Sequence, residues 1–382
     1  MQRLKGILRK AIYGLIHICS YRKTILFESM PDCSDNTKAV FDEMVRRGIN
    51  RKYDLVWILH SDNTPQETIP HVRYVAPSEK GRKYRLRNMC LFARAKCMLC
   101  CNGFLYPVLK RQKAYFLSHG TPIKSVRKYY NIPTMINHCL AASEDSARIL
   151  AYESKYPLEQ MFVLGYPRND VFSQVPRQIK TMLNTECSHI VVWYPTYRQH
   201  KNGKTTGSKN TLPIIHDSAL AKRLNAYACE KNILVVLKPH FAQDLSYVKE
   251  LGLSNIRLID DSFFANNHIS SYEFVAACDG LITDYSSIYY DYTLADKPVA
   301  VVWEDIEEYR NDPGFAVDVD NYLKGAQKIY TIDQFEAFLN DVVSGVDVLQ
   351  EDRREIRDLL NYATDGQNSK RVVDYIVATS KL

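Results

Sequence analysis

The sequence predicts an α/β protein made of two doubly wound, Rossmann-like domains that face a cleft. Short apolar runs alternate with amphipathic segments, which is the pattern of βαβ units on parallel sheets. The alternation pauses near residue 180 and then begins again, so the 382 residues hold two blocks of ordinary domain size. Unusual polar residues follow several of the apolar runs, where such sheets bind ligands. We expect domains at 24–180 and 181–382, after a separate segment at 1–23.

The first block alternates strands and helices from its first residue. Apolar runs predict strands at 24–28, 53–59, 96–101, 114–117, 138–142 and 161–164. Apolar residues at helical spacing predict helices at 36–47, 78–93 and 144–152. The helix at 78–93 is rich in basic residues.

The second block repeats the alternation and ends in helices. Apolar runs predict strands at 189–194, 233–237, 256–259, 280–283 and 298–302. Helices are expected at 218–231, 272–277 and 287–295, and three more at 332–343, 349–361 and 369–379. The polar stretch at 199–211 predicts a loop.

The first 23 residues form a basic segment without a single acidic residue. Its apolar middle is short, and no small-residue cleavage site follows, which argues against a signal peptide. Arg3, Lys5, Arg9 and Lys10 favour a basic amphipathic helix that lies on an anionic membrane surface. An ordinary helix packed on the first domain is the alternative.

The charge is distributed unevenly along the chain. Residues 1–135 hold 25 Lys and Arg but only 9 Asp and Glu, whereas the remainder holds 25 basic and 34 acidic residues. A basic half indicates an anionic partner such as a lipid surface or a polyanionic polymer. Nucleic acid ranks last, because no nucleic-acid-binding motif is present.

The ten cysteines do not predict a metal site. Cys97, Cys100 and Cys101 form a cluster, but no second pair lies at the spacing of a zinc site. They fall in an expected strand, so we interpret them as structural thiols of a reducing cytosol.

The end of the 280–283 strand carries the clearest ligand signal. Thr283, Asp284, Ser286 and Ser287 lead into a helix, whose N-terminus can bind phosphate through free backbone N–H groups and the helix dipole. Both serines can add hydroxyl donors, while Asp284 would orient the loop or pair with a base. The alternative is that Ser287 and Asp284 simply cap the helix.

His119 follows the 114–117 strand in the turn Ser118-His119-Gly120-Thr121-Pro122. Gly120 and Pro122 favour a tight turn that would hold the imidazole over the cleft. A histidine there can serve as a general base, although a lone histidine is also compatible with a structural role.

Two further strand ends carry cationic residues. Lys238 and His240 follow the 233–237 strand, and Arg198 follows the 189–194 strand. These side chains would bind a phosphate, with Arg198 suited to a bidentate contact. A solvated strand end is the alternative for each.

These residues belong to a series of motifs that resembles the CDP-glycerol glycerophosphotransferase family of teichoic-acid and related polymer synthesis. The order and spacing of the motifs carry the resemblance through most of the chain. The motifs are Phe27-Glu28-Ser29, Ser34-Asp35-Asn36-Thr37-Lys38-Ala39, His119-Gly120-Thr121-Pro122, Gly165-Tyr166-Pro167-Arg168-Asn169-Asp170, Tyr194-Pro195-Thr196-Tyr197-Arg198, Lys238-Pro239-His240, Ile282-Thr283-Asp284-Tyr285-Ser286-Ser287 with Asp291-Tyr292, Glu307-Glu308-Tyr309-Arg310 with Gly314-Phe315, and Asp365-Gly366-Gln367-Asn368-Ser369-Lys370-Arg371-Val372.

The resemblance implies a glycosyltransferase B fold, CDP-glycerol as donor, and peripheral attachment at the cytoplasmic face of a bacterial plasma membrane. It implies that His119 is the base on the acceptor hydroxyl and that His240 stabilises the donor phosphates. Ser286 and Ser287 match the family's phosphate-binding serines. Arg198 and Glu308 match motifs near the donor site, without individual roles, and Asp291 is expected to be a supporting residue.

The expected reaction is attack by a hydroxyl of a lipid-linked acceptor on the β-phosphorus, with release of CMP. The cationic residues make a bound metal dispensable, although free Mg²⁺ can assist. CDP-ribitol remains a second possible donor, because related members use it with similar motifs. The sequence is also compatible with a nucleotide-sugar transferase of the same fold and with a non-catalytic membrane assembly factor.

Overall fold

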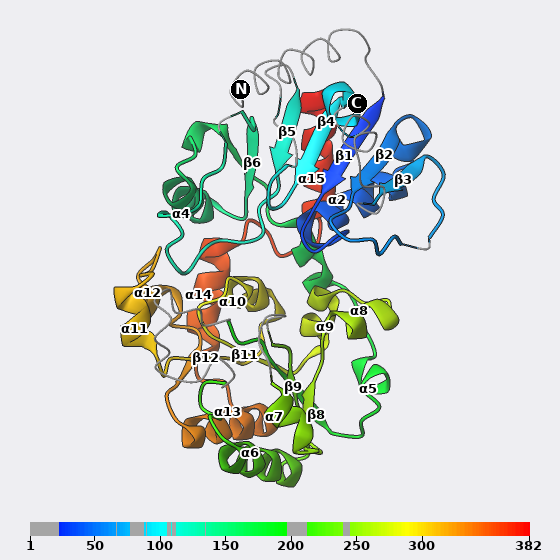
Figure 1. Cartoon of the computed structure of the whole chain (residues 1–382). Coiled ribbons are helices and arrows are strands. Elements are labelled where there is room, and N and C mark those ends of the chain that lie inside the picture. Colours follow the sequence, from blue (N-terminus) through cyan, green and yellow to red (C-terminus); the bar gives the residue numbers. More distant parts are fainter. Residues whose placement is uncertain are drawn as a thin grey trace, which may run out of the picture. The chain divides into compact units, whose positions relative to one another are not determined.

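A computed structural model describes residues 23–65, 67–76, 88, 90–104, 108, 112–133, 135–196, 212–239 and 245–382 (Figure 1). The expected membrane segment, apart from Lys23, lies outside these residues, as do Arg198, His240 and most of the expected 78–93 helix. The chain divides into two compact units. Unit 1 contains the residues up to Thr121, Tyr129–Asp170 and Asp365–Leu382, and unit 2 contains Pro122–Lys128 and Val171–Thr364.

Unit 1 contains a parallel sheet with the strand order β3-β2-β1-β4-β5-β6-β7. The order reverses between β1 and β4, as in doubly wound folds. The strands are β1 (Thr24–Glu28), β2 (Asp54–Ile58), β3 (Val72–Val75), β4 (Cys97–Cys100), β5 (Lys113–Phe116), β6 (His138–Ala141) and β7 (Met161–Val163).

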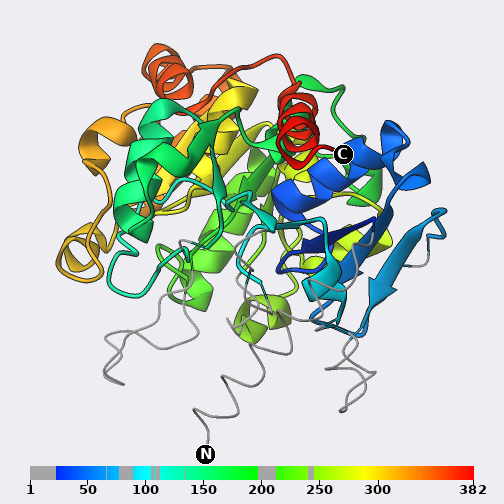
Figure 2. The same ribbon diagram turned by 90° about the horizontal axis from the view of Figure 1, so that it is seen from above.

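Helices cover both faces of this sheet, which is why its central strands are largely apolar and buried. On one face, α2 (Asp35–Arg46) and α15 (Asn368–Ser380) lie side by side and bury their apolar residues against β1, β2 and β4 (Figures 1 and 2). On the other face, Leu150 of α4 (Glu144–Ser154) joins the apolar cluster that includes Leu26 and Met98.

The last helix, α15, belongs to unit 1, whereas the sequence places it in the second domain. The carboxylate of Asp170 accepts hydrogen bonds from the backbone N–H groups of Asn368 and Ser369, both at 2.8 Å. An acidic side chain at this point satisfies backbone N–H groups that have no partner within the helix, and its negative charge interacts favourably with the helix dipole. Gly165 has φ 79° and lies against Asn368, where an added Cβ would overlap the Asn368 side chain. The chain therefore returns to unit 1 at residue 365. Apart from the short segment Pro122–Lys128, it passes into unit 2 after Asp170, ten residues before the expected boundary.

Unit 2 contains a second parallel sheet, with the equivalent strand order β10-β9-β8-β11-β12-β13. Its reversal lies between β8 and β11. The strands are β8 (His189–Trp193), β9 (Ile233–Leu237), β10 (Ile256–Leu258), β11 (Gly280–Thr283), β12 (Val299–Val302) and β13 (Gln327–Ile329). Two parallel sheets of this order confirm the expected class of two Rossmann-like domains.

The helices of unit 2 follow its strands in the usual α/β manner. Two of them, α6 (Ser218–Glu230) and α13 (Ile332–Ser344), pack together and bury one face of the sheet (Figure 1). The others are α5 (Ile179–Met182), α7 (Ser246–Glu250), α8 (Asp261–Asn266), α9 (Ser271–Ala277), α10 (Ile288–Tyr292), α11 (Ile306–Asn311), α12 (Val319–Tyr322) and α14 (Gln350–Leu360). Across the described part of the chain, no helix combines the length and apolar character needed to cross a membrane.

Candidate active site

The candidate residues lie at the carboxyl ends of the strands in both sheets. In doubly wound folds, ligands bind at this edge, next to the point where the strand order reverses. In unit 1 the turn with His119 follows β5, and in unit 2 the segment with Ser286 and Ser287 follows β11. The two groups belong to different units, so each is described on its own.

The turn after β5 exposes His119 between two residues in unusual backbone conformations. Ser118 has φ 58° and Gly120 has φ 133°, both in the region that favours glycine. Ser118 is buried, whereas the imidazole of His119 is exposed. A non-glycine residue at positive φ is held there by its surroundings, and such conformations cluster at functional sites.

The imidazole of His119 is fixed by a backbone carbonyl. Its Nδ1 lies 3.3 Å from the carbonyl oxygen of Cys101, at the end of β4. A carbonyl oxygen can only accept a hydrogen bond, so Nδ1 carries a proton, and in the neutral imidazole Nε2 keeps its lone pair. The ring also contacts Tyr130 edge to face, at 6.3 Å between centroids. This tautomer is the one that a general base requires.

Asn36 and Arg168, to which the sequence analysis assigned no role, hold this turn in place. The side-chain amide of Asn36 donates to the carbonyl oxygens of Leu117 and Ser118, both at 3.0 Å. Its oxygen accepts the backbone N–H of Arg168 at 3.0 Å. Asn36 is fully buried, so it replaces the strand partner that these carbonyls lack.

The guanidinium of Arg168 contacts the turn directly. Its Nη1 donates to the carbonyl oxygen of His119 at 2.9 Å and pairs with Asp35 Oδ1 at 2.7 Å. Arg168 is buried and lies over the Tyr166 ring. Asp35 and Arg168 belong to the motifs of the resemblance, which was the only sequence signal for their role. The structure gives them a positioning role around His119.

The expected turn residues beyond His119 have structural partners. The hydroxyl of Thr121 bonds to the hydroxyls of Ser146 and Tyr166, all buried. Pro122 begins a segment that belongs to unit 2. There, Ser125 N–H donates to the Gly314 carbonyl at 2.9 Å, beside the bridge of Lys124 with Phe315.

In unit 2, Thr283 and Asp284 join the ends of β8 and β11. The hydroxyl of Thr283 donates to the carbonyl oxygen of Tyr194 at 3.0 Å. The carboxylate of Asp284 accepts the backbone N–H of Thr196 at 2.8 Å and also the Thr196 hydroxyl. Both side chains are buried, at 0% and 1% exposed. Asp284 thus orients the loop after β8, and Thr283 has the same kind of positioning role.

Ser286 and Ser287 have free hydroxyls as far as the described residues go. Both are half-buried, and neither hydroxyl makes a hydrogen bond with a described residue. The backbone of Ser287 is already helical, with φ −59° and ψ −16°, and its side chain does not cap α10. The capping alternative is therefore not observed for Ser287. Asp291 of α10 is buried and accepts the Tyr272 hydroxyl at 3.0 Å.

Of the remaining donor-site candidates, Lys238 and Glu308 are among the described residues. Lys238 Nζ lies 3.1 Å from Asp261 Oδ1 and over the rings of Tyr194 and Phe264. Glu308 is exposed on α11. Arg198 and His240, which lie outside the described residues, cannot be placed against them.

An aromatic cluster that the sequence analysis missed lies beside Ser286. The ring of Tyr285 is 4.1 Å from that of Tyr309 and 5.3 Å from that of Phe315, between centroids. The Tyr285 hydroxyl donates to Asp305 Oδ1 at 3.0 Å. Tyr285 is buried, while Tyr309 and Phe315 are only partly covered and present ring surface.

Solved structures share the fold over the whole chain. The wall teichoic acid polymerase TagF matches with a TM-score of 0.79 and 20% identity, covering 100% of this chain and 96% of that one. A variant of that polymerase soaked with CDPG matches with a TM-score of 0.77 and 21% identity, over the same shares of both chains. These likenesses confirm the glycosyltransferase-like fold of two Rossmann-like domains.

Curated relatives act in teichoic acid synthesis. A teichoic acid poly(glycerol phosphate) polymerase of Bacillus spizizenii is 24% identical, over 93% of this chain and 92% of its own length. A teichoic acid glycerol-phosphate primase of Bacillus subtilis is 20% identical, over 89% and 88%. A teichoic acid ribitol-phosphate polymerase, TarK, of Staphylococcus aureus is 25% identical, over 97% and 71%.

The family model described as CDP-glycerol:poly(glycerophosphate) glycerophosphotransferase matches residues 12–378. The match includes His119, both serines after β11 and the motif at Arg168, and it confirms the resemblance that the motifs predict. The chain belongs to this family of teichoic acid phosphotransferases.

Proposed function

We propose that the protein transfers glycerol phosphate from CDP-glycerol to a hydroxyl of a lipid-linked acceptor, with release of CMP, in the synthesis of a teichoic-acid-like or capsular polymer. The observation that carries this proposal is the geometry of His119. Its Nδ1 bonds to the Cys101 carbonyl, and its Nε2 is exposed as a base at the ligand-binding edge of the sheet. Membership of the family supplies the class of donor.

The reaction follows from this base. The acceptor hydroxyl attacks the β-phosphorus of CDP-glycerol, and Nε2 of His119 takes its proton as the new P–O bond forms. The bond from the β-phosphorus to the bridging oxygen breaks, and CMP leaves with that oxygen. The second pKa of a phosphate monoester is about 6, so CMP leaves without a general acid.

The site in unit 2 would bind the donor. Ser286 and Ser287 supply hydroxyl donors to the diphosphate, and Lys238 supplies positive charge, together with Arg198 and His240 as expected from the sequence. These donors stabilise the charge that develops on the leaving group. The partly covered rings of Tyr309 and Phe315 can stack on a nucleobase. With these groups no bound metal is required, although free Mg²⁺ can assist.

The first experiment is CMP release by the purified protein with CDP-glycerol and, in parallel, CDP-ribitol, UDP-glucose and UDP-N-acetylglucosamine, with membrane extract as acceptor. We expect turnover with CDP-glycerol. Turnover with CDP-ribitol alone would replace the alditol, an outcome that the similarity to a ribitol-phosphate polymerase makes a specific second candidate. Release of UDP alone would move the protein to the sugar transferases and reject the proposal.

The same assay tests the donor site through paired serine variants. Ser286→Ala and Ser287→Ala should each raise the KM for the donor about 10-fold or more, because each removes a hydrogen bond to a charged group. Ser344→Ala, at the exposed end of α13, is the matched control and should leave the donor KM unchanged. An unchanged donor KM in both site variants would remove the serines from phosphate binding.

We also propose that the protein attaches peripherally to the cytoplasmic face of the plasma membrane through its basic N-terminal segment. Replacing Arg3, Lys5, Arg9 and Lys10 together by Gln should release the protein from anionic vesicles in a sedimentation assay, because each basic residue near such a surface contributes about 1 kcal/mol. Sedimentation that is unchanged by these replacements would contradict membrane binding by this segment.

A further inference from the structure

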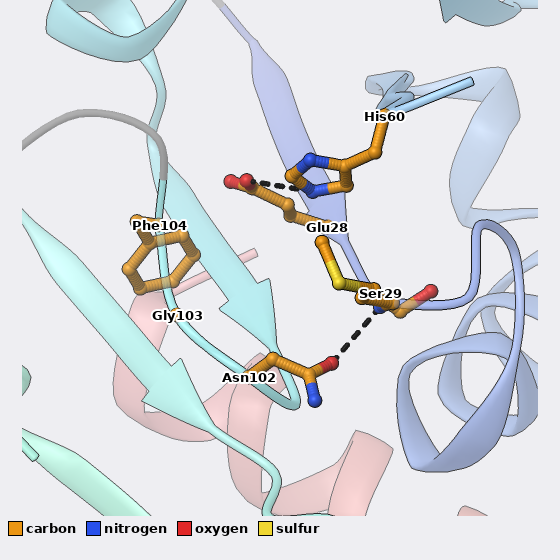
Figure 3. A pocket seen from close by; sticks show the side chains of 7 residues that line it. Glu28, Ser29, His60, Asn102, Gly103 and Phe104 are labelled. Carbon is orange, nitrogen blue, oxygen red and sulfur yellow. Dashed lines mark hydrogen bonds and ion pairs between the residues drawn. The ribbon is translucent and has the colours of Figure 1, made fainter. Parts of the chain in front are cut away.

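A cavity opens in unit 1 at the same edge of the sheet as the His119 turn. Its volume is about 230 Å³, and it lies where β1, β2 and β4 end (Figure 3). The lining residues are Glu28, Ser29, Met30, His60, Asn102, Gly103 and Phe104. The order of the strands reverses between β1 and β4, so this is the position at which doubly wound folds bind ligands.

The titratable residues that line the cavity are one carboxylate and one histidine. Glu28 Oε1 lies 3.1 Å from His60 Nε2, and Figure 3 shows this pair within the cavity. The bond to the Glu28 carboxylate raises the pKa of His60, which favours a protonated imidazole beside the carboxylate. The neighbouring Asp32 accepts the backbone N–H groups of His60 and Ser61, both at 2.8 Å. The lining therefore has no surplus positive charge for a diphosphate, and a neutral ligand fits better.

The other lining groups suit a ligand with several hydroxyls on a carbon frame. Glu28 is 3% exposed, and a carboxylate accepts several hydrogen bonds from neighbouring hydroxyls. Asn102 Oδ1 accepts the backbone N–H of Met30 at 2.9 Å, while its amide nitrogen makes no hydrogen bond with any described residue. Phe104 adds an apolar wall for C–H groups.

The size of the cavity limits the ligand to a small unit. Pockets that hold drug-sized ligands usually measure about 300–1,000 Å³, so this one suits a single alditol or sugar unit. The remainder of a longer ligand would extend beyond the cavity.

The cavity lies close to the proposed base along the sheet. Glu28 pairs with Cys100 across β1 and β4, and Cys100 pairs with Phe116 across β4 and β5. Neighbouring strands are about 4.8 Å apart, so the backbones of Glu28 and Phe116, two strands apart, are separated by about 10 Å across the sheet. The carbonyl that holds His119 belongs to Cys101, the residue before Asn102.

We propose that this cavity binds the polyhydroxylated unit of the acceptor that carries, or directly precedes, the attacking hydroxyl. The proposal rests on the transfer reaction proposed above. The unit could be the terminal alditol of a growing polymer or a sugar of a lipid-linked primer, and both present neighbouring hydroxyls on a neutral frame.

The test compares wild type with Glu28→Gln, His60→Asn and Asn102→Ala. The two probes are a synthetic glycerol phosphate trimer and octyl N-acetylglucosaminide. Binding of each probe is titrated without donor, and the acceptor and donor KM values are measured with CDP-glycerol. We expect each variant to weaken binding and raise the acceptor KM about 10- to 100-fold for one probe, with a donor KM that stays within about 2-fold. The affected probe identifies the source of the unit.

Two choices make the test independent of folding and of the proposed reaction. Asn102 is exposed, so Asn102→Ala leaves the core intact even if Glu28→Gln folds poorly. His71→Asn removes another histidine of unit 1 that faces a carboxylate, Asp54, at 3.7 Å, and should change neither binding nor KM. If wild type releases no CMP but binds a probe that Asn102→Ala no longer binds, the proposed reaction is rejected, whereas ligand binding in the cavity is supported. Equal binding of both probes by wild type and all three variants overturns the proposal that this cavity binds the acceptor.

Discussion

Replacing His119 by Ala is expected to lower kcat for transfer by on the order of 10²-fold or more, because general base catalysis contributes about that much. The physical reason is the hydrogen bond from Nδ1 to the Cys101 carbonyl, which leaves Nε2 as the basic atom of an exposed ring. The measurement is the initial rate of CMP release at saturating donor and acceptor. The variant should fold normally, since the side chain is exposed.

His119→Asn separates the base from the structural contact. The amide of Asn can place an N–H near the Cys101 carbonyl, where Nδ1 lies, but it has no atom that corresponds to Nε2. If His119 is the base, His119→Asn loses as much activity as His119→Ala. Activity near that of wild type in His119→Asn would show that the ring only anchors the turn.

Arg168→Ala should lower the free energy of unfolding by about 3 kcal/mol, the lower end of the range for breaking a buried ion pair, because the Asp35 carboxylate left behind is partly exposed. Arg168 pairs with Asp35 at 2.7 Å and is buried. The same change removes the donor to the His119 carbonyl, and a shift of the turn by about 1 Å can cost about 10²-fold in rate. Chemical denaturation and the CMP assay measure the two effects.

The double variant Asp35→Asn with Arg168→Ala distinguishes stability from positioning. Asp35 has φ 61°, a conformation that Asn tolerates well, so the neutral residue should remove the unpaired charge without backbone strain. We expect stability to recover in part while kcat stays low, because the His119 carbonyl still lacks its donor. Recovery of both would mean that Arg168 acts on activity only through stability.

Most of the strands that the sequence predicted have continuous apolar runs; β10, with Arg257 between two apolar residues, is an exception. β9, Ile233–Leu237, is buried at every position, and burial on both faces produces just such a run. β3 and β13 were missed because each is an edge strand of mixed polarity. In Val72–Val75, Arg73 is exposed, and in Gln327–Ile329 only Ile329 is buried. Short half-exposed strands lack a pattern that distinguishes them from loops.

The candidate site was predictable where a strand end and a local motif coincide. His119, Ser286 and Ser287 each follow an apolar run by a few residues, so the chain itself places them at the ligand-binding edge. Asn36 and His60 were not assigned roles, because their partners are Leu117 and Glu28, 81 and 32 residues away in the sequence. Contacts over such separations leave no periodic signal.

The domain assignment of the last helix shows the same limit. The amphipathic pattern of 369–379 predicted a helix, and α15 confirms it. The unit on which this helix packs, however, is decided by the hydrogen bonds from Asp170 and by the space that Gly165 leaves for Asn368. Neither is visible in the pattern of the helix itself. Proximity in sequence to α14 therefore assigned the helix to the second domain, whereas the structure assigns it to unit 1.

Because α15 belongs to unit 1 but follows unit 2 in the chain, unit 2 can be completed before unit 1 during synthesis. The ribosome synthesises the sheet of unit 1 before unit 2, but Val372, Val373 and Ile376, which complete its core, come after unit 2. A nascent chain that ends at residue 364 contains the whole of unit 2, whereas the unit 1 sheet still lacks α15, which covers one of its faces together with α2. Such exposed apolar surface is prone to aggregation and chaperone binding. The core of the unit that carries His119 is thus completed only when translation has passed α15.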